Sequence, residues 1–427
     1  MTQLRDRKTP IAMSPRLLLA ATTNWPTAAR LAGAFARLSW RVEVLAPAGT
    51  PACASRFVHA RQPYSALDPL GSLAAAVARS APDLVIPCDD RACAQLIALH
   101  AQAVILRRPD VAGLIARSLG TPQDYETLTT RSAFIAAAAA LGIAVPRTRA
   151  IANDAEFDAA LAEIGLPAVI KSDGSWGGDG VAIAYSREEA RALFRRLSRP
   201  VSPVRSALRS LRRRDAHHLV AALAPSPPRL SMQALVTGRP ATTTFAAWEG
   251  TLLAAVHLDV AVATGETAPA SVVRRIHDPA MERAARRLAR RFGLSGLHGL
   301  DFIRGASGAV HLIEINPRAT QTAALALGEG RDLAAALAER ATGYATAART
   351  PAIDNDLVAL FPQEWCRDPQ SPYLAVAHHD VPWGDPALVR ALLAQPRRTA
   401  VWQWLMRTRP ALPSLRPGNH PAIASER

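Results

Sequence analysis

The chain has 427 residues, of which 49% are hydrophobic, so it is not a disordered protein and we expect two or three subdomains with buried cores. Its formal net charge is +15, yet only two of its 50 basic residues are lysines, a bias that accounts for most of the arginines without a polyanion partner. No run of 18 apolar residues occurs, so we expect no membrane-spanning helix.

The first hundred residues alternate short apolar runs with helical stretches. After a loose leader over residues 1–14, the strand-like RLLLAA precedes the helical PTAARLAGAFARLSW, and RVEVLAP and PDLVIPCDD are further strand candidates. Spacing of this kind favours a parallel sheet with right-handed crossovers. No GxGxxG pattern follows the first strand, so the sequence does not support a dinucleotide site there.

A glycine-rich loop follows a helical region over residues 101–150, whose Ala-rich helix is predicted to end at Gly142. The strand-like runs LPAVIKSDG and GVAIAYS flank GSWGGDG, which has four glycines in seven residues. Such a loop leaves backbone N–H groups able to bind phosphate oxygens. Lys171, one of the two lysines, precedes the loop at the end of a strand, where its ammonium can lie along phosphates.

An arginine-rich segment over residues 191–214 contains nine arginines and no acidic residue. Val204, Leu208 and Leu211 recur at helical spacing, which predicts an amphipathic basic helix. We interpret it as a solvated lid helix, with contact to an acidic substrate or an anionic surface as the alternative. Nucleic acid is disfavoured, because Phe194 is the one aromatic residue among these arginines.

Further strand-like runs follow, and a turn is predicted at Glu249-Gly250. Polar side chains gather near the end of the last pair of strands. If residues 305–308 form the hairpin loop, Asp301 lies opposite Leu312, and Glu314 is its diagonal neighbour on the same face. Asn316 points to that face too. Oxygen ligands on rigid strands suit Mg²⁺, whereas the alternative is a solvated polar face.

The order of these parts resembles the ATP-grasp superfamily. The stretches LPAVIKSDGSWGGDGVAIAYSREEA and GLHGLDFIRGASGAVHLIEINPRATQ look most like its carbamoyl-phosphate-synthetase and biotin-carboxylase branch, and IEINPR is the most specific piece. The resemblance runs from about residue 16 to 345. It implies an α/β and α+β protein, with an ATP-grasp fold and an N-terminal Rossmann-like pre-ATP-grasp domain.

The resemblance also implies domain bounds. The expected parts are a leader over 1–14, a Rossmann-like domain over 15–110, an ATP-grasp domain over 111–345 with its glycine-rich lid at about 165–232, and a C-terminal extension over 346–427. The extension ends in a basic tail with Trp402, Trp404 and several prolines. We interpret this tail as packed or disordered in preference to contacting a membrane surface.

The matching residues are expected to form a nucleotide site. By resemblance, the phosphates and the flap would involve Arg131, Lys171, Gly177, Gly178 and Gly180. Magnesium, with manganese as an alternative, would be held by Asp301, Glu314 and Asn316. Arg318 would face the reacting carboxylate and, with Lys171, would be catalytic.

The adenine-binding linker departs from the usual pattern of the superfamily. Gln233 is followed by alanine where relatives often carry Gln-Glu, and the backbone near Leu235 is expected to bind adenine. Pro240 stands where many relatives have a glutamate that contacts ribose. The nucleotide preference is therefore left open.

The implied activity is that of an ADP-forming carboxylate-amine ligase. A small-molecule carboxylate would attack the γ-phosphate of ATP to give an acyl phosphate, and an amine or similar nucleophile would then displace phosphate. An ATP-dependent carboxylase or a carbamoyl-phosphate-forming enzyme is one alternative, and a non-catalytic nucleotide- or polyanion-binding protein is another. Four cysteines without zinc-ligand spacing favour a reducing cytoplasm, and a homodimer is compatible with the sequence.

Overall fold

The computed structural model describes most of the chain. The described residues are 14–173, 180–199, 206–208, 210, 217, 220, 228–265, 269–306, 308–328, 330–344 and 353–394. The flap glycines Gly177 and Gly178, most of the arginine-rich segment beyond residue 199, and the tail from residue 395 lie outside them. Among the described helices, none combines the length and the apolar character needed to cross a membrane.

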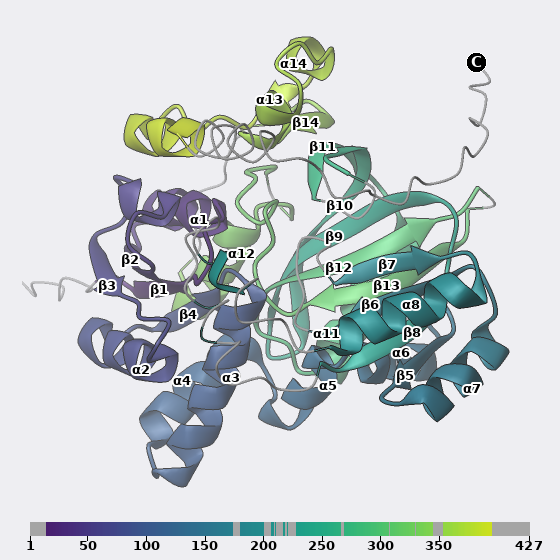
Figure 1. Ribbon diagram of the computed structural model, residues 1–427. Helices are drawn as coiled ribbons and strands as arrows, with labels where there is room; N and C mark the ends of the chain where they lie inside the picture. Colours follow the sequence, from purple (N-terminus) through teal and green to yellow (C-terminus); the bar gives the residue numbers. More distant parts are fainter. Residues whose placement is uncertain are drawn as a thin grey trace, which may run out of the picture.

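The N-terminal domain is a parallel sheet with helices on both faces (Figure 1). Its strand order is β3-β2-β1-β4, which agrees with the predicted Rossmann-like arrangement. The strands are β1 (Arg16–Ala20), β2 (Arg41–Ala46), β3 (Ala60–Pro63) and β4 (Leu84–Pro87). The helices are α1 (Thr27–Ala36), the 3-10 turn η1 (Pro51–Ala54), α2 (Pro69–Ser80), α3 (Asp90–Ile105) and α4 (Pro109–Leu119).

The central strand β1 is apolar throughout because helices cover both of its faces. Leu17 and Leu19 pack into the core that contains α1, whereas Leu18 packs into a second core with residues of α2, α3 and α4. A strand buried on both faces needs such a continuous apolar run, unlike the alternating pattern of a half-exposed strand. The same packing fixes the carboxyl end of β4, from which α3 begins.

Three short helical elements connect this domain to the rest of the molecule. They are η2 (Pro122–Asp124), α5 (Tyr125–Thr129) and α6 (Arg131–Ala140). Helix α6 ends just before Gly142, whose φ of +69° lies in the left-handed region that favours glycine. The predicted end of the Ala-rich helix is therefore confirmed.

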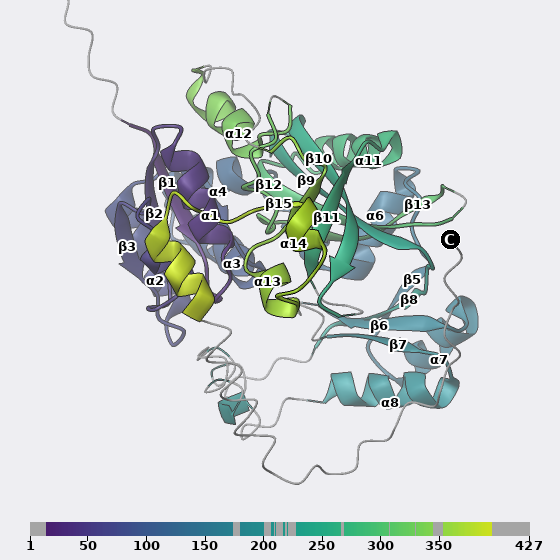
Figure 2. The same ribbon diagram turned by 90° about the horizontal axis from the view of Figure 1, so that it is seen from above.

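A small antiparallel sheet lies apart from the N-terminal domain and has two helices packed against it (Figure 2). Its order is β5-β8-β6-β7. The elements are β5 (Thr148–Ile151), α7 (Asp154–Ile164), β6 (Ala168–Ser172), β7 (Val181–Ala184), α8 (Arg187–Ser198) and β8 (Leu230–Ala234). Phe157 of α7 stacks on Phe194 of α8 with ring centroids 5.1 Å apart, so the beginning of the arginine-rich segment is part of this core.

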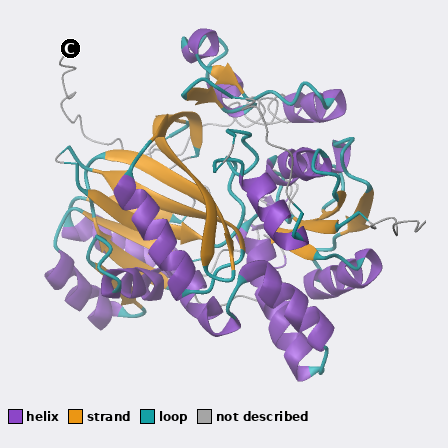
Figure 3. Cartoon of the chain, turned by 180° about the vertical axis from the view of Figure 1, so that it is seen from behind, coloured by secondary structure: helices purple, strands orange, loops and turns teal. Residues whose placement is uncertain are grey.

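The larger sheet has seven strands in the order β13-β12-β9-β10-β11-β14-β15. Its first five strands in chain order are β9 (Arg239–Trp248), β10 (Thr251–Ala263), β11 (Ala270–Ile276), β12 (Gly296–Arg304) and β13 (Val310–Asn316), all antiparallel to their neighbours. The predicted turn at Glu249-Gly250 is confirmed, with both residues at positive φ. Helices lie across one face (Figure 3), where α6 and α11 (Pro279–Arg291) share a core with the sheet.

The other face of the large sheet packs toward the N-terminal domain. Helix α12 (Leu333–Thr342) contacts β9, β10 and α1, so one core joins the two parts of the molecule. The chain then adds β14 (Leu357–Ala359) to the edge of β11, followed by α13 (Gln363–Arg367), α14 (Tyr373–Val376) and β15 (His378–His379). The first part of the C-terminal extension is therefore part of the sheet.

Candidate active site

The hairpin of β12 and β13 brings the two predicted metal-binding carboxylates together. Asp301 pairs directly with Glu314, and a bulge separates this pair from the next one, Phe302 with Leu312. The expected register, with Asp301 opposite Leu312 and Glu314 only diagonal to it, is wrong. The loop closes by a bond from the Gly305 backbone N–H to the carbonyl of residue 309, and this loop and the bulge each move the pairing by one residue.

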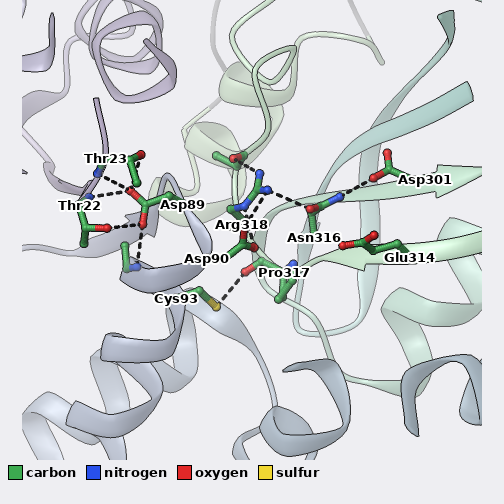
Figure 4. A network of polar contacts seen from close by, with 12 residues as sticks. Thr22, Thr23, Asp89, Asp90, Cys93, Asp301, Glu314, Asn316, Pro317 and Arg318 are labelled. Carbon is green, nitrogen blue, oxygen red and sulfur yellow. Dashed lines mark hydrogen bonds and ion pairs between the residues drawn. The ribbon is translucent and has the colours of Figure 1, made fainter. Parts of the chain in front are cut away.

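Asn316 joins Asp301 to Arg318 (Figure 4). Its Nδ2 donates to Asp301 Oδ2 at 2.9 Å, and its Oδ1 accepts from Arg318 Nη2 at 2.9 Å. Burial, together with the neighbouring Glu314 carboxylate, raises the pKa of Asp301. A positive ion between these oxygens would oppose that shift, because it favours the charged carboxylate.

The donor set fits a magnesium ion that shares its coordination with a second ligand. Asp301 and Glu314 supply carboxylate oxygens, the hard donors that Mg²⁺ requires, whereas the Asn316 Oδ1 accepts from Arg318 in this structure. The described residues contain no group of three or more His, Cys, Asp and Glu side chains able to hold a metal. Asp301, Glu314 and Asn316 therefore stay predicted ligands, and water and phosphate oxygens would fill the remaining positions.

Two cations approach the same carboxylates from other elements. Arg131, the first residue of α6, donates from Nη2 to Glu314 Oε1 at 2.8 Å and also contacts the carbonyl of Ser172. Lys171 on β6 donates from Nζ to the carbonyl of Ile313 at 3.4 Å. Strand β6 of the small sheet thus lies beside β13, the edge strand of the large sheet, although the two strands are far apart in sequence. We call the polar residues gathered at this junction the seam: Arg131, Lys171, Asp301, Glu314, Asn316 and Arg318.

Burial and neighbouring charges shift the pKa values of Glu314 and Lys171. Burial alone would raise the pKa of Glu314, but Arg131, Lys171 and Arg318 together hold it below its ordinary value. Burial lowers the pKa of Lys171, and the nearby Arg131 lowers it further, while Glu314 opposes both. An anionic ligand such as a phosphate would stabilise the protonated form of Lys171.

Arg318 follows β13 and reaches the N-terminal domain. Its Nε and Nη2 donate to the two carboxylate oxygens of Asp90, at 2.9 and 3.1 Å (Figure 4). Asp90 begins α3, directly after the helix-capping residue Asp89. Asp90 is not among the site residues predicted from the sequence. A signal for it was present, because acids that follow a parallel strand lie at the carboxyl end of the sheet, where such folds bind ligands.

The expected adenine contacts lie on and beside β8. Gln233 is buried and donates from Nε2 to Thr148 Oγ1 at 3.0 Å, while the backbone N–H of Leu235 donates to the carbonyl of Pro167 at 3.2 Å. Gly180 is the one expected flap glycine among the described residues, and its carbonyl accepts from the Ser172 backbone N–H at 2.8 Å. Their roles toward a nucleotide remain predictions.

A cavity of about 110 Å³ adjoins this seam. Its walls come from α3, from the α5–α6 region and from β13 and the residue after it, so the N-terminal domain closes one side. The lining residues are Asp90, Cys93, Ala94, Leu128, Thr129, Arg131, Phe134, Ile313, Glu314, Ile315 and Pro317. This cavity could not be predicted from the sequence, because its walls are joined only in the folded chain.

Two family models match the chain over the regions that carry this geometry. The model described as "ATP-grasp domain" matches residues 220–322, and the one described as "Carbamoyl-phosphate synthase L chain, ATP binding domain" matches residues 130–204. The chain is also 32% identical over 135 residues to the carbamoyl phosphate synthase large chain of Gemmatimonas aurantiaca. That match covers 31% of this chain but only 12% of the relative.

Solved structures share the fold over most of the chain. A biotin carboxylase from Campylobacter jejuni has a TM-score of 0.57 at 13% identity, with 78% of this chain and 72% of that one covered. An ADP complex of N5-carboxyaminoimidazole ribonucleotide synthetase has a TM-score of 0.54 at 15% identity, with 76% of each chain covered. Residues 220–322 thus match an ATP-grasp domain, residues 130–204 match the ATP-binding domain of the carbamoyl-phosphate synthase L chain, and the chain shares the fold of these solved structures.

Proposed function

We propose that this protein is a ligase that uses Mg²⁺ and ATP to activate a carboxylate as an acyl phosphate and then couples it to an amine or a similar nucleophile. The observation that carries the proposal is the seam between the sheets. There Lys171 and Arg131 stand against the Asp301–Glu314 pair, and Arg318 adjoins it through Asn316. The resemblance to ligases of the superfamily supports it.

Each residue of the seam has a task in phosphoryl transfer, which depends mainly on positioning and charge. Lys171 and Arg131 would neutralise the phosphates, and Arg318 would orient the substrate carboxylate through its planar fork. Asp301, Glu314 and Asn316 would hold magnesium, which supplies charge neutralisation between phosphate oxygens.

The reaction balances without a protein nucleophile. One carboxylate oxygen attacks the γ-phosphorus, the bond from that phosphorus to the β–γ bridging oxygen breaks, and ADP leaves with the electron pair. The amine then attacks the acyl carbon, loses a proton, and phosphate departs. A carboxylase or carbamoyl-phosphate-type reaction is the second candidate, favoured by the named relatives, because bicarbonate would present the same group to Arg318.

The test is phosphorus NMR of the purified protein with Mg·ATP and pools of small carboxylates and amines, with bicarbonate as a separate pool. Pool-dependent ADP and phosphate support the proposal, and subdividing the active pool identifies the substrates. AMP and pyrophosphate would indicate adenylation instead and would overturn the acyl-phosphate route. Turnover driven by bicarbonate alone would favour the second candidate.

Glu314→Gln is the variant that tests the metal-binding assignment most directly in this assay. The amide keeps the size of the side chain but removes the charge that faces Arg131 and Asp301, so we expect ADP formation to fall by about a hundredfold or more. The matched control is Glu126→Gln. Glu126 is an exposed residue of α5 whose contact with Arg229 is 3.5 Å long. Equal losses in the two variants, or none in Glu314→Gln, would remove Glu314 from the site.

A further inference from the structure

The paired N–H groups with which Arg318 would bind a substrate carboxylate are already occupied by another side chain of the protein. Arginine binds a carboxylate best through two parallel N–H···O bonds, and Asp90 makes both of them with Nε and Nη2. The other N–H of Nη2 is engaged by Asn316 Oδ1. A substrate carboxylate therefore has no free two-point site on Arg318 while these contacts stand.

Asp90 is placed so that it can lose this partner at low cost. It lies in the first turn of α3, a 16-residue helix, where the positive end of the helix stabilises a carboxylate. Its neighbour Asp89 is held by the backbone and hydroxyl groups of Thr22 and Thr23 and caps the helix at Ala92. The helix end thus stays fixed by Asp89 when the Asp90 side chain moves.

The cavity of about 110 Å³ gives the Asp90 side chain a place to turn. Asp90 lines it together with Thr129 and with Arg131, whose guanidinium also pairs with Glu314 on the same wall, and the Asp90 side chain is 26% exposed even when paired with Arg318. A carboxylate that swings away from Arg318 into this space keeps polar neighbours. Its release would therefore not leave a buried, unpaired charge, which is the usual cost of breaking such a pair.

We propose that Asp90 occupies Arg318 in the free protein in place of the substrate carboxylate, and that the substrate binds by displacing it. The inference rests on the proposed function, because it takes Arg318 as the carboxylate site. Asp90 then sets the affinity for the carboxylate. Weakly binding anions fail to displace it, whereas a carboxylate with further contacts in the site succeeds.

The direct test uses acetate as the probe and needs no turnover. Asp90→Asn keeps the side-chain size but removes the competing charge, so acetate should raise the melting temperature of this variant at an at least about tenfold lower concentration than in the wild type. Chloride at equal ionic strength and pH is the reference. An equal response of the two proteins to acetate, or no response in either, overturns the inference.

The matched control is Asp110→Asn. Asp110 also lies in the first turn of a helix and is also held by both Nε and Nη2 of an arginine, Arg108, but it is exposed and far from Arg318 in the fold. We expect its acetate response to equal that of the wild type. If Asp90→Asn does not fold, Asp90→Ser, which keeps a hydroxyl in the first turn of the helix, carries the same expectation.

Turnover separates this inference from the proposed function. If no carboxylate yields ADP with the wild type, the proposed function fails, while the acetate response still decides the role of Asp90. If a carboxylate does yield ADP, Asp90→Asn should lower the KM for that carboxylate about tenfold and leave the KM for ATP unchanged. A raised KM for the carboxylate would make Asp90 a fixed positioning partner of Arg318 and would overturn the inference.

Discussion

At the scale of single residues, the surroundings of Lys171 give a reason for a lysine in a chain whose basic residues are arginines at all but two positions. The side chain is 5% exposed and reaches from β6 to the backbone of β13. A compact ammonium on a flexible stem fits this narrow seam, whereas a guanidinium is wide and planar. Arg131 already supplies the planar cation beside it.

Lys171→Arg should therefore weaken nucleotide binding although the charge is kept. We expect the affinity for Mg·ADP, measured by calorimetry, to fall about tenfold, because the wider group cannot enter the seam without moving Arg131 or β13. Lys8→Arg makes the same replacement at the other lysine and serves as the control. Unchanged affinity in Lys171→Arg would mean that only the charge at this position matters.

The residues predicted from strand periodicity and loop composition lie on one hairpin or next to one loop, whereas Arg131 and Gln233 are expected only through the resemblance. Asp301 and Glu314 were predicted to converge because strand periodicity alone puts them on one face, even though their register was wrong. Asp90 could not be predicted to touch Arg318, because 228 residues separate them and the contact depends on how two domains pack. The bulge beside Asp301 likewise has no signature in the sequence.

At the scale of elements, the parallel strands of the N-terminal domain were predictable because buried strands and helices alternate there. Strands β14 and β15 were not, since they have three and two residues and form only against β11 and each other. The short helix α13 contacts β11 and so stabilises this added edge of the sheet. Its residue Glu364 is fully buried and accepts from Ser271 of β11 at 2.7 Å and from Arg367.

The hydrogen bonds to Glu364 predict how the unfolding free energy depends on pH. Hydrogen bonds from Arg367, against the opposing effect of burial, and further bonds from Ser371 and Ser271 lower the pKa of Glu364 to about 2. A carboxyl whose pKa is depressed in the folded state adds stability above its unfolded pKa and loses it as pH falls toward the folded value. The wild type should thus lose about 2 kcal/mol of unfolding free energy from this group between about pH 7 and pH 3.

Denaturant unfolding of Glu364→Gln beside the wild type isolates that contribution. The variant should be less stable at neutral pH and should show a flatter loss of stability on acidification, because the titrating group is gone. The exposed Glu163, which pairs with Arg149 at the surface, provides the control substitution Glu163→Gln. Parallel pH curves for Glu364→Gln and the wild type would contradict the assignment.

At the scale of the whole molecule, the segment after residue 352 ties the N-terminal domain to the large sheet. Arg30 of α1 forms an ion pair with Asp380, and Leu388 and Leu392 enter the core that α1 shares with α12. Asp385 is buried and accepts from Ser55 Oγ at 2.6 Å and from the Arg56 backbone N–H at 3.1 Å. The domain that carries Asp90 is thereby held against the part that carries Arg318.

Asp385→Ala should loosen this connection and so affect a site it does not touch. The variant loses the cap at Leu388 and removes the acceptor of the Ser55 hydroxyl, whose Oγ keeps only the Phe57 backbone N–H, and this should cost about 2 kcal/mol of unfolding free energy. If the two domains are held together mainly here, amide exchange should rise at the first turn of α3 as well as around Ser55. Asp354→Ala, at an exposed position of the same segment, should change neither. Faster exchange confined to the region of Ser55 would show that the shared core around α1 and α12 suffices to keep Asp90 within reach of Arg318.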